Sequence, residues 1–157
     1  MGNHKGRKKN KILPKHRVQR INTSSLENKV KDSSLFSDGE VTFVHGMEEK
    51  MSEVLLDFAA PFLDDIDEPK EMEKVISFAA AVWNLSLLPE NQQKNGMKEI
   101  TDIFGQGGQE YQNVGAFMTE VLLERKKKLY QNNKRFIVNY ELGFKNGLPW
   151  LNVASTI

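Results

Sequence analysis

The sequence contains no cysteine, so disulfide bonds and thiolate metal centres are excluded. Only three histidines are present, His4, His16 and His45, and none lies in a segment that we expect to form the core. They do not form the spaced pair of a metal-binding motif, and no nucleophile-elbow pattern accompanies them. The sequence therefore predicts no catalytic residue, no metal site and no cofactor, and it favours a protein without enzymatic activity.

The sequence also lacks a long apolar run. The best candidate, residues 75–88, is interrupted by Ser77, Asn84 and Ser86, and it is shorter than the roughly 20 residues that a bilayer crossing needs. The basic N-terminus is not followed by the apolar segment of a signal peptide. We therefore expect a cytoplasmic protein that does not associate with membranes.

Charge is segregated along the chain, although the net charge is only +1. Residues 1–20 contain eight Lys or Arg and no acid, and residues 40–124 contain 17 Asp or Glu against five Lys. Residues 125–135 then add six basic residues and no acid. Such asymmetry says more about possible partners than the total charge does.

The first basic run is the most specific charge feature. Arms of this kind bind nucleic acid by neutralising phosphates, and the absence of interleaved aromatic residues argues against base stacking. Two other interpretations remain: a tail that only aids solubility, or an arm that contacts an acidic surface of this protein or of a partner. The candidate nucleic-acid-binding residues are Lys5, Arg7, Lys8, Lys9, Lys11, Lys15, Arg17 and Arg20.

Residues 72–88 are expected to form the buried central helix of a small domain. The segment is apolar on more than one face, and Trp83 needs a partner for its indole N–H if it is buried. Pro69 suits the first helical turn, and Pro89 disfavours continuation beyond residue 88. The principal apolar face consists of Met72, Val75, Ile76, Ala79, Val82, Trp83 and Leu87.

Three further helices are predicted around this segment. The first begins at Met47 and should kink or restart at Pro61, the second covers residues 90–104, and the third covers about residues 109–130. Residues 105–108 are glycine-rich, and a helix end explains them better than a phosphate-binding loop does. The apolar stripe expected on the last helix consists of Tyr111, Val114, Met118, Val121, Leu122 and Leu129.

Beyond residue 135 the pattern changes to strand alternation, and Asn146-Gly147 is a strong hairpin signal. A two-residue loop there pairs Leu142 with Leu151, Tyr140 with Val153, and Val138 with Ser155, and it sets Trp150 opposite Gly143. Residues 41–44 could add a short third strand. The predicted fold is α+β: about four packed helices, a C-terminal β-hairpin and a flexible basic arm.

The expected organisation is a basic, disordered arm at residues 1–38 and a single domain at residues 39–157. The leading functional hypothesis is a binding or adaptor protein whose arm contacts RNA, DNA or a ribonucleoprotein surface. The first alternative is a protein–protein interaction module that uses the acidic helical face or the hairpin edge. The second is a small metal-dependent enzyme built on Asp57, Asp64, Asp65, Asp67 and Glu68, although this cluster fits a solvated helix N-terminus better. The sequence leaves the oligomeric state open.

Overall fold

The structure, a computed structural model, describes residues 26, 28, 49–104, 106 and 108–157. From residue 49 onward, the described residues include four α-helices, the short 3-10 helix at Ala60–Phe62 and an antiparallel two-stranded sheet. The predicted α+β fold is therefore confirmed. The basic arm residues and the proposed strand at residues 41–44 lie outside the described residues, although Leu26 is described as helical and buried.

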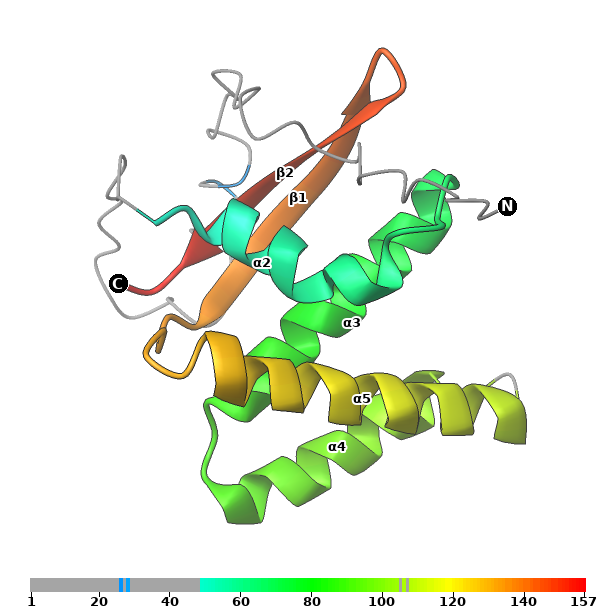
Figure 1. Cartoon of the computed structure of the whole chain (residues 1–157), viewed down its shortest axis with the longest axis vertical. Coiled ribbons are helices and arrows are strands. Elements are labelled where there is room, and N and C mark those ends of the chain that lie inside the picture. The colour runs from blue at the N-terminus through cyan, green and yellow to red at the C-terminus, as the bar shows by residue number, and fades with distance from the viewer. Residues whose placement is uncertain (1–25, 27, 29–48, 105, 107) are drawn as a thin grey trace, which may run out of the picture.

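Helix α3 (Pro69–Ser86) is the central element, as the sequence predicted. Pro69 lies in its first turn, where the missing N–H costs no hydrogen bond. The helix contacts α2 (Met51–Ala59), α4 (Glu90–Phe104), α5 (Gln109–Leu129) and β1 (Ile137–Lys145), so most of its faces are covered (Figure 1). Ala79 and Trp83 are fully buried, and of the expected face Val75 and Leu87 are only partly buried.

Helix α2 (Met51–Ala59) packs its apolar face against α3 and the hairpin. Pro61 interrupts the α-helical pattern, and the chain continues as the 3-10 helix η2 (Ala60–Phe62). Because proline cannot donate the hydrogen bond that an α-helix requires within its interior, this restart is the expected outcome. Met47 itself lies outside the described residues, but Glu49 and Lys50 are not helical, so the helix starts at Met51 and the predicted start was too early.

Helices α4 (Glu90–Phe104) and α5 (Gln109–Leu129) form an antiparallel pair on the other side of α3 (Figure 1). Gly96, inside α4, permits close approach to α3, since a Cβ atom there would lie 2.3 Å from Cδ1 of Leu85. Helix α4 continues through the Asn95-Gly96 pair. The lack of a side chain at Gly96 leaves room for Leu85 of α3.

The predicted apolar stripe of α5 was wrong in phase. Leu122 is buried, but Tyr111, Val114 and Leu129 are exposed, and Met118 and Val121 are only partly buried. The buried residues of α5 are Gly115, Thr119, Leu122 and Lys126. The Thr119 hydroxyl donates a 2.8 Å hydrogen bond to the Gly115 carbonyl, so polar residues occupy an inner face that apolarity alone could not reveal.

Strands β1 (Ile137–Lys145) and β2 (Leu148–Ser155) form the predicted hairpin. Asn146 and Gly147 have φ values of 53° and 73°, which is the left-handed conformation that a tight two-residue loop requires. The pairings Leu142–Leu151, Tyr140–Val153 and Gly143–Trp150 are confirmed. The Trp150 ring covers Gly143 so closely that a Cβ atom there would lie 2.1 Å from it.

The predicted pairing of Val138 with Ser155 was wrong. A bulge lies between Ile137 and Asn139, so Ser155 pairs with Ile137 and Val138 is the extra residue. This shift places Ile137 in the core, with 4% of its surface exposed. At the bulge, the Ile137 side chain therefore packs into the core that the helices form.

Two side chains of α3 hold the hairpin by its backbone. The Asn84 amide donates to the Ile137 carbonyl and accepts from the Ile137 N–H, with both distances 2.8 Å. The Trp83 indole N–H donates to the Arg135 carbonyl, also at 2.8 Å. The partner that the Trp83 indole was expected to need is thus the backbone just before β1.

Replacement of Asn84 by Ala should lower the free energy of unfolding by about 1–3 kcal/mol, because two backbone groups of Ile137 lose their partners. Urea denaturation of Asn84→Ala measures this loss. Ser77→Ala, at an exposed position of the same helix, should change stability by less than about 0.5 kcal/mol. Equal stability of the two variants would contradict the proposed role of Asn84.

Candidate functional site

The eight arm residues proposed for nucleic-acid binding, Lys5, Arg7, Lys8, Lys9, Lys11, Lys15, Arg17 and Arg20, lie outside the described residues. The acidic cluster is described, and its members do not converge. Asp64, Asp65, Asp67 and Glu68 are exposed in or beside the link between η2 and α3, whereas Asp57 lies on α2. Within the described residues, no group of three or more His, Asp or Glu is placed to hold a metal ion.

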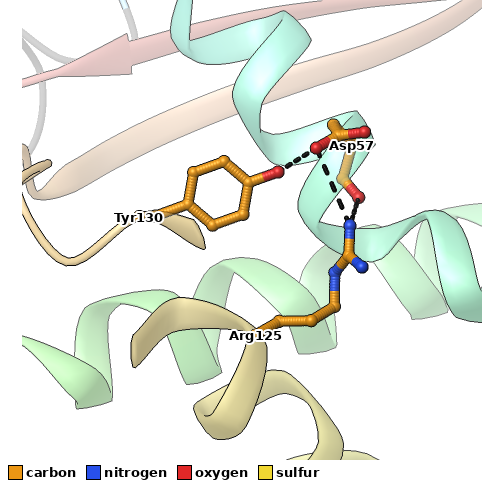
Figure 2. Close-up of polar contacts among 3 residues, drawn as sticks. All are labelled: Asp57, Arg125 and Tyr130. Carbon is orange, nitrogen blue, oxygen red and sulfur yellow. Dashed lines mark hydrogen bonds and ion pairs between the residues drawn. The ribbon is translucent and has the colours of Figure 1, made fainter. Parts of the chain in front are cut away.

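Asp57 belongs instead to a polar cluster with Arg125 and Tyr130, which Figure 2 shows in detail. The Tyr130 hydroxyl donates a short hydrogen bond to the Asp57 carboxylate. Arg125 donates from Nη2 to the Asp57 backbone carbonyl at 2.8 Å, and the same nitrogen lies 3.7 Å from the carboxylate. The cluster joins α2 to the end of α5 across 68 or more residues of sequence.

Tyr130 is the most strongly perturbed titratable group of this cluster. Burial raises its pKa to about 12, and the neighbouring Asp57 carboxylate acts in the same direction because it disfavours a phenolate. Its ring lies edge-on to Phe58, with the centroids 6.0 Å apart, and 5.6 Å from the ring of Trp83. With so high a pKa, the phenol is a hydrogen-bond donor at neutral pH and not a base.

Lys126 is buried beneath this aromatic group, with only 5% of its surface exposed. Its ammonium group donates to the carbonyls of Tyr130 at 2.8 Å and Asn133 at 2.9 Å, and it lies 4.6 Å from the centroid of the Trp83 ring. Burial lowers the pKa of Lys126, and the charge of Lys134 lowers it further. A buried lysine with a lowered pKa can serve as a nucleophile, so this group needs a chemical assessment.

The contacts of Lys126 favour a structural role. Two of its three N–H donors are directed at backbone carbonyls and its charge faces an aromatic ring, which are interactions of the protonated form. One of these carbonyls follows the last turn of α5, where backbone acceptors lack helical partners. The hydrogen bonds of Lys126 thus fix the backbone between α5 and β1, while Arg125 and Tyr130 attach this region to α2.

The second basic run, residues 125–135, is largely used inside the fold. Besides Arg125 and Lys126, Arg135 donates from Nη1 to the Glu49 carbonyl at 2.8 Å and from Nε to the Thr156 carbonyl at 3.0 Å. Lys128 pairs with Glu124 at 3.0 Å on the surface of α5. The sequence shows these charges but not their internal partners, because the partners lie far away in the chain or on the backbone.

An exposed apolar face on α5 is a further surface feature. Tyr111, Val114 and Phe117 have 61%, 54% and 61% of their surface exposed. Ile103, in the last turn of α4, is 63% exposed. We define the α5 surface row as the exposed or partly exposed positions Glu110, Val114, Phe117, Val121, Glu124 and Lys128. Val114 and Val121 of this row were predicted to lie in the core, since exposed and buried apolar residues on one helix produce the same periodicity.

Comparison with known protein families, characterised proteins and solved structures finds no match. None of the helices in the described part of the chain combines the length and apolar character that a membrane crossing requires. Function is therefore inferred from the residues themselves.

The hydrogen bond of Tyr130 should make stability depend on pH in the alkaline range. The raised pKa means that the folded state favours the neutral phenol, so its stabilisation is complete below pH 10 and is lost as the pH rises through about 12. The difference in urea midpoint between the wild type and Tyr130→Phe should shrink over this range. Tyr111→Phe, at an exposed position, is the control, and a difference that stays constant to pH 12 would refute the assignment.

Replacement of Lys126 by Met should lower the free energy of unfolding by about 1–3 kcal/mol, because the carbonyls of Tyr130 and Asn133 lose their donor. Lys127→Met removes the same charge at an exposed position and should be close to neutral. Thermal or urea denaturation measures both variants. A Lys126→Met protein as stable as Lys127→Met would show that the buried ammonium group does not hold this connection.

Proposed function

We propose that this protein is a non-enzymatic binding or adaptor protein whose basic arm, residues 1–20, contacts RNA, DNA or a ribonucleoprotein surface. The observation that carries the proposal is the run of eight Lys or Arg without a single acid. Each phosphate that such a run neutralises releases counterions, which favours binding without sequence specificity.

The basic residues at positions 125–135 of the folded domain support this proposal, because most of them already have partners within the domain. Of the six basic residues between positions 125 and 135, four have partners within the domain: Arg125, Lys126, Lys128 and Arg135. Much of this second run is thus committed to holding the fold or to surface pairing. Any phosphate binding by the protein should depend mainly on the arm.

A non-enzymatic role agrees with the geometry of the polar cluster. Tyr130 is protonated at neutral pH, Asp57 accepts its hydrogen bond, and Lys126 is covered by Trp83 and two carbonyls. These groups stabilise one another and present no nucleophile beside a base.

A second candidate function is a protein–protein interaction module. The sequence suggested the acidic helical face or the hairpin edge for this role. The observation that favours this function in the structure is the exposed apolar part of the α5 surface row, centred on Val114 and Phe117. Binding that survives deletion of the arm and high salt would favour this second function.

Deletion of residues 1–20 should abolish most of the affinity for single-stranded RNA. The logarithm of the binding constant should fall linearly with the logarithm of salt concentration in the full chain, by about 0.7 per neutralised phosphate. Fluorescence anisotropy with labelled RNA at several salt concentrations measures the slope. An unchanged slope after the deletion would contradict the proposal.

A matched pair of double variants locates the contacts. Lys8→Ala with Lys9→Ala should reduce the slope by about 1.4, whereas Lys127→Ala with Lys134→Ala, at exposed positions of the domain, should leave it nearly unchanged. Equal effects of the two pairs would mean that the domain surface contributes as much as the arm.

A further inference from the structure

The α5 surface row has the spacing of a helix-pairing seam. Its positions, 110, 114, 117, 121, 124 and 128, are separated alternately by four and three residues. This spacing keeps side chains along one line of an α-helix and is the repeat by which two helices pack through a narrow apolar stripe. Val121 is partly buried, and the other five positions are exposed.

The row is symmetric about Thr119, and its chemistry makes that symmetry useful. In an antiparallel pairing centred at this residue, Phe117 of one chain faces Val121 of the other, and Val114 faces Glu124. Glu110 then faces Lys128 at each end, so that opposite charges lie outside the central apolar contacts between Phe117 and Val121. A parallel pairing would instead set Glu110 against Glu110 and Lys128 against Lys128, and like charges across an interface are unfavourable.

We propose that the α5 surface row binds the same row of a second copy of this chain, antiparallel, with the two-fold axis between Phe117 and Val121 on the outer side of α5, at the level of Thr119 along the helix. Such an interface is isologous, since each contact occurs twice and the assembly closes as a dimer. The evidence for a second copy as the occupant is the charge complementarity of the row with itself. The inference goes beyond the proposed function and does not depend on the arm.

The ion pair between Lys128 and Glu124 is compatible with this assembly. Its atoms are 3.0 Å apart and both side chains are more than half exposed, so the pair is surrounded by water in the single chain. In the dimer, Lys128 would lie between its own Glu124 and Glu110 of the second copy. In the dimer, the acidic end of α5 in one copy would therefore attract the basic end of α5 in the other.

Charge reversal in the full chain tests both the dimer and its register. Sedimentation equilibrium should show a dimer for the wild type, and Glu110→Lys or Lys128→Glu should raise its dissociation constant about tenfold, because two attractive pairs become repulsive. The combination of both reversals restores opposite charges and should restore the dimer. Glu120→Lys and Lys127→Glu make the same charge changes at exposed α5 positions off the row and should leave association unchanged.

Because the chain has no native cysteine, single introduced thiols give an independent measure of orientation. Glu110→Cys mixed with Lys128→Cys should form a cross-link between positions 110 and 128. Glu110→Cys alone should not, because 18 residues of helix separate positions 110 in the two copies by about 27 Å. Efficient linkage of position 110 to itself would overturn the antiparallel arrangement.

A single-chain mass across the whole concentration range would overturn the inference, and Phe117→Glu then identifies the reason. If this substitution strongly destabilises the monomer, residues of the same chain cover the row. If it leaves stability unchanged, the row remains in water. Either result leaves the RNA-binding proposal intact, whereas a dimer that fails to bind RNA would remove that proposal and keep this one.

Discussion

Trp83 has a polar N–H group that must find an acceptor once its large ring has left water, and this requirement links the helices to the hairpin. The acceptor is the Arg135 carbonyl, immediately before β1. Phe58 packs edge-on at 5.2 Å and Lys126 lies over the ring, so α2, α5 and the start of β1 all depend on one side chain of α3. Loss of this indole would remove packing, a hydrogen bond and the partner of a buried charge together.

Much of this fold could be predicted because its boundaries are marked by local chemistry. Pro69 marks the start of α3, and α4 covers the predicted residues 90–104. Asn146 and Gly147 adopt the positive φ values that fix the hairpin loop. Each of these signals acts within a few residues and does not need knowledge of the distant chain.

The predictions were wrong where contacts between residues far apart in the sequence determine the structure. The phase of α5 was wrong because Thr119 and Lys126 face the core, where their polar groups are satisfied by backbone carbonyls. The bulge in β1 accompanies the two hydrogen bonds between Asn84 and the Ile137 backbone, which join residues 53 positions apart. The contact between Asp57 and Tyr130 joins positions 73 residues apart, and no local sequence pattern in either segment predicts it. The arm residues lie outside the described part of the chain, so their role stays a prediction.

The attachment of the hairpin to α3 has a consequence for the order of events during synthesis. Ile137 and Leu151 belong to the same core as Phe58 and Trp83. While a ribosome is still making β2, the residues of all four helices and of β1 have been made, but Leu151 has not yet joined the core. The apolar surface that Leu151 covers therefore stays open until the second strand is made, so completion of the core comes late in synthesis.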